Sequence, residues 1–148
     1  MTRLPALGLT LAIALPAHAA TYTAGAISAV EPWSRPAAAG MTGAGYLTLA
    51  NGGTAADALV GAESPAAVRV EIHRSSVTGG VSRMAKVEQV AIPAGGRITF
   101  APGGYHLMLV GLKAPLKAGQ KVPATLTFAS GRKLSVAFTV SDGMGPPS

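Results

Sequence analysis

The sequence predicts an all-β fold, an antiparallel β-sandwich built as a single domain. The chain has 148 residues, about the size of one globular domain with one core. Seven to nine short stretches alternate apolar with polar residues, and turn signals separate them, as in sandwiches and small barrels. No amphipathic helical stretch exceeds two turns, because Gly or Pro interrupts each candidate.

The first 19 residues are predicted to be a signal peptide. Arg3 precedes an apolar run at residues 6–15, and a small-residue cleavage pattern ends at Ala19. This run is too short to span a bilayer comfortably, so we expect an exported protein without stable membrane insertion. An uncleaved anchor is the alternative. The expected domain covers residues 20–141, followed by a flexible tail at residues 142–148.

Alternation then predicts the individual strands in order. Residues 44–51 alternate until Gly52 and Gly53 end the pattern. In residues 68–73, Val and Ile occupy one face and the polar residues, including His73, the other. The other predicted strands end at Gly- or Pro-containing turns; they are residues 81–92, 97–100, 105–112, 125–128 and 133–140.

Composition excludes several classes of function. The chain has no cysteine, which removes disulfides, thiol catalysis, thiolate zinc sites, iron–sulfur clusters and blue-copper centres. The serine-nucleophile, zinc-protease and phosphate-loop motifs are also missing, so we expect no enzyme. Nucleic-acid binding is disfavoured although the formal net charge is +6, because the cationic residues are scattered and aromatics make up only 5%.

Four side chains carry the chemistry that remains. His73 is expected to end one strand and Met84 to begin the next, across the turn at residues 78–80. His106 and Met108 are two residues apart, so they project from the same face of a strand. Two imidazoles and two thioethers form a soft, uncharged ligand set that suits Cu(I). The alternative reading is structural, with Met filling the core and His hydrogen-bonded.

The spacing of these residues resembles that of the periplasmic copper chaperones of the PCuAC type. Ten residues separate His73 from Met84, twenty-one separate Met84 from His106, and one separates His106 from Met108, which matches the family pattern His-x10-Met-x21-His-x-Met. The resemblance runs from about residue 26 to residue 140. It is carried further by the segments 32–36, 45–51, 70–73 and 102–109.

This resemblance implies a cupredoxin-like Greek-key sandwich in which the four residues hold Cu(I), with Cu(II) as a further state to test. It also implies a periplasmic chaperone that delivers copper to a partner such as the CuA site of cytochrome c oxidase, alone or with a Sco-type protein. Two alternatives stay open. One is a copper-sequestering or storage protein with the same site, and the other is a β-sandwich binding module without metal.

The sequence departs from the family at Arg74, where the family often has a second Met after the first His. Neighbouring residues on a strand point to opposite faces, so we expect Arg74 to leave the site intact. Glu71 shares the face of His73 and is expected either to orient that ring or to pair with a nearby arginine.

Other residues near the predicted strand ends are weaker candidates for a role at the metal site. Met41 and Met144 are candidate accessory thioethers, although a loop or tail role is the default. Trp33 is expected either to shield the site or to pack in the core. A basic face near the same strand ends is a candidate surface for an acidic partner; it comprises Lys113, Lys117, Lys121, Arg132 and Lys133.

Overall fold

The computed structural model describes residues 19–147, and this part of the chain is all β with no helix. The predicted fold class is therefore confirmed. The predicted signal peptide lies outside the described residues except for Ala19. The eleven strands are β1 (Thr21–Ala24), β2 (Ile27–Ser34), β3 (Gly43–Asn51), β4 (Asp57–Glu63), β5 (Ala67–Thr78), β6 (Val81–Lys86), β7 (Val90–Ile92), β8 (Arg97–Phe100), β9 (Tyr105–Leu112), β10 (Lys121–Phe128) and β11 (Lys133–Val140).

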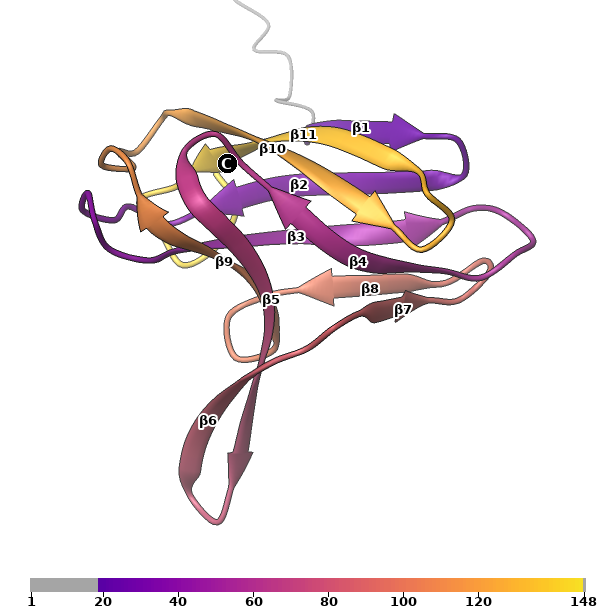
Figure 1. Cartoon of the computed structure of the whole chain (residues 1–148), viewed down its shortest axis with the longest axis horizontal. Helices are drawn as coiled ribbons and strands as arrows, with labels where there is room; N and C mark the ends of the chain where they lie inside the picture. The colour runs from indigo at the N-terminus through magenta and orange to yellow at the C-terminus, as the bar shows by residue number, and fades with distance from the viewer. Residues whose placement is uncertain (1–18, 148) are drawn as a thin grey trace, which may run out of the picture.

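The strands form one continuous hydrogen-bonded path that folds over on itself. Its order is β6-β5-β9-β3-β2-β11-β10-β4-β7, with β1 added to β2 and β8 to β3. β4 and β10 cross over β2 and β3 (Figure 1), and side chains of both layers, such as Leu49 and Leu126, form a single buried core. All pairs are antiparallel except β2 with β11, which is parallel, so the sheet is mixed rather than purely antiparallel as predicted.

Strand β5 is longer than predicted, and the prediction that His73 ends a strand is wrong. β5 continues to Thr78, and β6 returns from Val81, so His73 and Met84 both lie within strands. Gly79 and Gly80 connect them with φ angles of 58° and 76°. Both values are typical of a two-residue hairpin turn of type I′, whose twist matches that of the paired strands. Glycine adopts these positive φ angles without a steric penalty.

The outer part of this hairpin, residues 75–86, projects away from the sandwich (Figure 1), and we call it the arm. All of β6 is exposed, and β5 beyond Arg74 pairs only with β6. The polar sequence explains the projection, because the arm has too few apolar side chains to form a buried face.

The aliphatic face predicted for the start of β5 is only partly buried. Ile72 belongs to the core, but Val68 is 70% exposed, whereas its neighbour Ala67 is 4% exposed and belongs to the core. Val70 is half-buried. Alternation thus identified the strand correctly and overestimated how much of it the sandwich covers.

Asp57 ties the start of β4 to the turn between β10 and β11. Its carboxylate accepts hydrogen bonds from the Ser130 hydroxyl at 2.6 Å and from the backbone N–H groups of Ser130 and Ala58. Burial raises the pKa of Asp57, but these hydrogen bonds and the charge of Arg132 outweigh it, so the pKa lies below its ordinary value of 3.8. The ionised form is therefore the one that the fold stabilises.

We expect the Asp57→Asn variant to lose about 1 kcal/mol of unfolding free energy at neutral pH, because it loses charge-assisted hydrogen bonds. Since the folded-state pKa is depressed, this contribution is present above the unfolded pKa of about 3.9 and disappears as pH falls through the folded value. Urea midpoints at pH 7 and pH 3 measure it. Asp142→Asn, in the exposed tail, is the control, and an equal loss in both variants would contradict the assignment.

Candidate metal centre

The four candidate ligands come from three neighbouring strands and share one face. His73 on β5 is paired with His106 on β9 on one side and with Lys86 on β6 on the other. Met84 is paired with Ser75, two residues along from His73. Residues paired across antiparallel strands point to the same face, and so do residues two apart. The backbone pairing therefore turns His73, Met84, His106 and Met108 to the same side.

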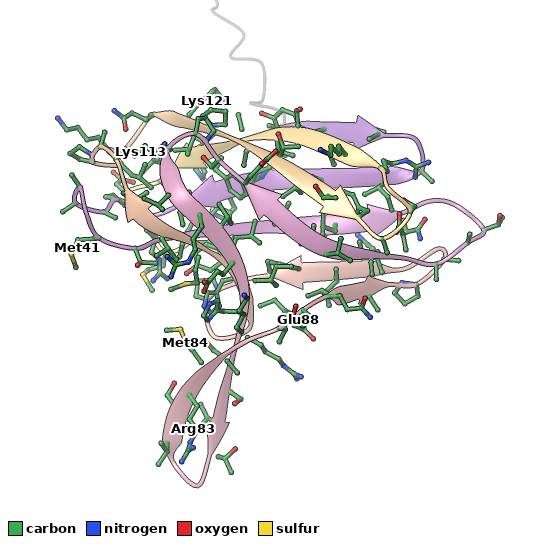
Figure 2. The ribbon with its side chains drawn as sticks, in the orientation of Figure 1. Met41, Arg83, Met84, Glu88, Lys113 and Lys121 are labelled. Atoms are coloured by element: carbon green, nitrogen blue, oxygen red, sulfur yellow. The ribbon has the colours of Figure 1, made fainter. Side chains whose placement is uncertain are left out.

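Side-chain positions bring this set close together. The rings of His73 and His106 are 5.9 Å apart between centroids. Met84, His106 and Met108 line one pocket of about 240 Å³, together with Arg35 and Tyr46 among others. His73 does not line the pocket itself but lies against His106 at its side. Met84 reaches the pocket from the arm and is 62% exposed (Figure 2), whereas His106 is buried.

Each of the two imidazoles has one nitrogen tied to an acceptor and one nitrogen free. His73 Nε2 lies 2.8 Å from the Glu71 carboxylate, and His106 Nδ1 lies 3.0 Å from the Gly104 carbonyl oxygen. Both partners can only accept, so the ring N–H must be at these two atoms. The other two nitrogens, His73 Nδ1 and His106 Nε2, are buried without a hydrogen-bond partner among residues 19–147. Each therefore presents an unused lone pair.

Glu71 fixes the orientation of His73 from a position two residues away on the same face. One carboxylate oxygen accepts a hydrogen bond from His73 Nε2, and the other accepts one from Arg69 Nε at 2.8 Å. The hydrogen bonds from Arg69 and His73 lower the pKa of Glu71 from 4.5 to about 2. The group thus stays an acceptor-only carboxylate across the neutral range. Of the two roles weighed for Glu71, orienting the ring and pairing with an arginine, it performs both at once.

Arg74 points away from the candidate ligands, as its position next to His73 predicted. It pairs with Tyr105 on β9, on the face opposite His73, and its guanidinium lies 5.4 Å from the centre of the Tyr105 ring. That distance is typical of a cation–π contact. The expectation that Arg74 points to the face opposite His73 is confirmed.

The secondary candidates lie outside the pocket. Trp33 is 5% exposed and is paired with Tyr46, against whose ring it packs with centroids 4.6 Å apart, so it stands beside Tyr46 on the face that carries the pocket but does not line the pocket itself. A register shift between Val30 and Trp33, where Glu31 has a φ of 50°, places it there. Met41 and Met144 are both exposed, and neither lines the pocket.

The basic face predicted near the site does not form. Lys113 follows the end of β9, and His106 lies near its start. At the usual rise of a strand, the two residues are about 23 Å apart along the chain. Lys133 lies at the turn end of the β10–β11 hairpin, and Lys121 lies at its open end. The five cations are therefore divided between separate places. The sequence could not show this, because their distribution depends on which strands pair.

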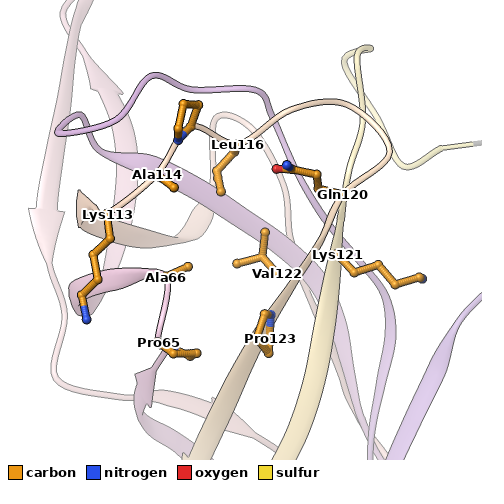
Figure 3. Close-up of a pocket in the computed structure, with 10 residues that line it drawn as sticks. Pro65, Ala66, Lys113, Ala114, Leu116, Gln120, Lys121, Val122 and Pro123 are labelled. Atoms are coloured by element: carbon orange, nitrogen blue, oxygen red, sulfur yellow. The ribbon is translucent and has the colours of Figure 1, made fainter.

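A second pocket, of about 440 Å³, lies at the Lys113 end of the molecule (Figure 3). Its wall is apolar, with Leu116, Val122 and Pro123, and Lys113 and Lys121 stand at its edge. It contains none of the candidate ligands and no imidazole or thioether. The four candidate ligands therefore lie at the pocket on β5, β6 and β9 and not at this one.

Arg35 lines the pocket that contains Met84, His106 and Met108, and the sequence did not single it out as a site residue. Two of its guanidinium nitrogens, Nε and Nη2, are buried with no hydrogen-bond partner in the described part of the chain. The guanidinium lies 5.7 Å from the centre of the Tyr46 ring. Burial raises the pKa of Tyr46 above 10.0, and the charge of Arg35 offsets part of this. Only the resemblance over residues 32–36 pointed to this segment.

The donor set decides which metal the pocket can hold. Within residues 19–147, no three His, Asp or Glu side chains gather in a metal-binding cluster. A metal ion here would need the thioethers of Met84 and Met108 beside the two free imidazole nitrogens. Thioethers bind hard cations poorly and Cu(I) well, so the residues present fit Cu(I).

Comparisons with known proteins show the family to which the chain belongs. A family model described as "Putative lipoprotein LpqE-like" matches residues 27–140. The "Putative lipoprotein Lxx21020" of Leifsonia xyli subsp. xyli is 41% identical over 143 residues, which is 94% of this chain and 86% of that protein. No helix in the described residues is long and apolar enough to cross a bilayer.

Two solved structures illustrate the structural likeness. Cu(I)-DR1885 from Deinococcus radiodurans, a solution structure, has 37% identity and a TM-score of 0.60, with 76% of this chain and 78% of that chain covered. The copper-bound PCuAC domain from PmoF2 has 24% identity and a TM-score of 0.71, with 84% and 99% covered, and it supports the fold alone.

Proposed function

This chain belongs to the LpqE-like lipoprotein family, and we propose that it is a member that binds Cu(I) and passes it to a partner protein as a copper chaperone. The resemblance to PCuAC-type proteins and the cupredoxin-like sandwich are confirmed by the structural neighbours. One of them, DR1885, has its structure described with Cu(I), and this chain is 37% identical to that relative over a match that covers 76% of this chain.

A single observation carries the proposal. His73 Nδ1 and His106 Nε2 are buried nitrogens with free lone pairs, and they lie on the face that also carries Met84 and Met108. A buried polar atom without a partner costs free energy, and a metal ion would satisfy both nitrogens at once. We assign His73, Met84, His106 and Met108 as the ligands of Cu(I).

The environment favours Cu(I) over Cu(II). All four proposed ligands are neutral, and the nearest carboxylate, Glu71, is already engaged by Arg69 and His73. The unpaired guanidinium of Arg35 adds positive charge to the pocket wall, and this charge opposes a divalent ion more than a monovalent one. Cu(II) prefers nitrogen and oxygen ligands in tetragonal geometry, which this set does not offer.

The same features favour delivery over catalysis or storage. Neutral Met and His ligands hold a metal that can be exchanged, and Met84, on the exposed arm, is open to an incoming ligand. We propose that the protein acts in the periplasm and that its recipient is a copper site such as CuA of cytochrome c oxidase, alone or with a Sco-type protein. Storage is the alternative with the same site, and it predicts retention of the metal.

Transfer in solution tests delivery against storage. We expect the protein loaded with one Cu(I) to give up most of its copper to an equimolar soluble apo CuA domain, because the thiolate ligands of such an acceptor bind Cu(I) more strongly than neutral thioethers and imidazoles do, and the exposed Met84 allows rapid ligand exchange. The two proteins are separated by ion exchange and their copper is measured. In the control, a dialysis membrane keeps them apart and transfer should fall sharply. Retention of copper in the mixed sample favours storage, and failure to take up Cu(I) favours a binding module without metal.

A further inference from the structure

The arm and the metal pocket form one continuous surface. Ser75 and Met84, both on the arm, line the pocket beside His106 and Met108. Val77, two residues beyond Ser75 on the same face, is 72% exposed. This metal-side face of the arm therefore consists of Ser75, Val77, Ser82, Met84 and Lys86. Any protein that contacts it stands next to the proposed copper ligands.

The arm carries only positive charge. Residues 73–86 contain no acidic residue, and Lys86 lies on the metal-side face, whereas Arg74 and Arg83 lie on the opposite face of the same hairpin. The carboxylate nearest the site, that of Glu71, is neutralised by its contact with Arg69. The pocket adds the unpaired Arg35. A bound Cu(I) with four neutral ligands would add one further positive charge.

Arg35 has the character of an incomplete ion pair. A buried guanidinium without an acceptor is costly, and a carboxylate is the group that its fork of N–H donors fits best. No acidic side chain pairs with it among the described residues. Arg35 lines the open pocket, so a carboxylate that enters the pocket meets its guanidinium, whose buried Nε and Nη2 become available after a small movement of the side chain.

We propose that an acidic copper-accepting protein docks on the metal-side face of the arm and places a carboxylate on Arg35. This inference rests on the proposed chaperone function and adds the docking surface and the chemistry of its partner. Opposite charge speeds encounter and fixes register, and the exposed Val77 supplies apolar contact. Met84 then lies at the interface, where a ligand of the acceptor can replace it.

A second copy of this chain is a poor occupant of the same surface. β6 ends the strand path, and its outer edge has no partner strand among the described residues. Two such edges from identical chains would bring Arg83 and Lys86 of one arm against those of the other. Like charges on an edge strand oppose pairing between copies, whereas an acidic partner gains from them.

Two matched variants of the arm test the docking face. Val77→Glu places a negative charge on the metal-side face, and Val81→Glu places the same charge on the opposite face, near the same turn. With a soluble apo CuA domain of net negative charge as acceptor at an ionic strength of about 0.15 M, where the Debye length is about 8 Å, we expect Val77→Glu to slow second-order copper transfer about tenfold. Val81→Glu should stay within about threefold of the wild type, because charge at this distance is partly screened.

Both variants should keep the Cu(I) affinity of the wild type, since neither valine is a proposed ligand. Equal slowing by both variants, or slowing by neither, would overturn the docking face. A wild-type protein that takes up no Cu(I) would refute the proposed function and this inference together. Normal uptake with unaffected transfer would refute the inference alone. A dimer at working concentration, dissociated by Val77→Glu, would show that a second copy occupies the arm.

Arg35→Gln tests the carboxylate contact through two readouts of opposite sign. We expect slower transfer, about tenfold, because the partner loses its anchor, together with a Cu(I) affinity equal to or above that of the wild type, because a positive charge has left the pocket. Arg35→Lys keeps the charge without the planar fork and should recover part of the rate. Transfer at the wild-type rate in Arg35→Gln would overturn the contact.

Discussion

Replacing Met84 and Met108 together by alanine is expected to lower the Cu(I) affinity about a hundredfold or more, which corresponds to about 2.7 kcal/mol. The thioethers are the soft half of the ligand set, and the two imidazole nitrogens that remain cannot complete a shell for Cu(I). The two methionines come from β6 and β9, so no single strand can compensate for their loss. Anaerobic competition with a chromophoric Cu(I) chelator measures the affinity.

The matched control removes two other thioethers. Met41→Ala with Met144→Ala takes away the same number of sulfur atoms from exposed positions outside the pocket. We expect this double variant to bind one Cu(I) as tightly as the wild type. Equal affinity in all three proteins would refute the ligand assignment, and a larger loss in the control would move the site to the loop and the tail.

Replacing Glu71 by glutamine is expected to weaken Cu(I) binding about 10- to 100-fold, although Glu71 does not bind the metal. The carboxylate accepts the Nε2–H of His73 and so leaves Nδ1 as a lone pair. An amide can donate as well as accept, and so it permits the tautomer in which Nδ1 carries the proton and is blocked. The Gln variant also loses the charge-assisted contact to Arg69.

Glu88→Gln is the control, because it removes the same charge from an exposed position close to the arm (Figure 2). We expect its affinity to remain that of the wild type. Nitrogen NMR of the apo-protein provides a second measurement: His73 should be protonated at Nε2 in the wild type and divided between two tautomers in Glu71→Gln. Identical His73 spectra together with identical affinities would rule out the role of Glu71.

Elements with strict alternation and clear turns could be predicted from the sequence. β8 and β9 have their predicted bounds, because Pro and Gly interrupt the chain on both sides of each strand. β2 was not predicted, since Pro32 and the irregular backbone at Glu31 break its period of two. β4 was not predicted either, and its Gly61 weakens the pattern. Local sequence pattern does not predict a strand whose formation depends on pairing and packing with neighbouring strands.

The sequence by itself determined the chemistry of the candidate site. The absence of cysteine, the pairing of His with Met and the interval between His106 and Met108 are properties of composition and spacing, and they hold before the chain folds. Spacing of two is sufficient to put these side chains on one strand face, because the period of a strand is local.

Only the tertiary structure decided how that chemistry is set up. Which nitrogen of each imidazole is free depends on Glu71 and on the Gly104 carbonyl, which accept hydrogen bonds from the other nitrogen. Burial keeps the free nitrogens without a hydrogen-bond partner among the described residues. The exposure of Met84, the unpaired Arg35 and the separation of the lysines all follow from pairings between strands far apart in the chain. Such pairings depend on how the whole chain packs into one core, and no local pattern contains that information.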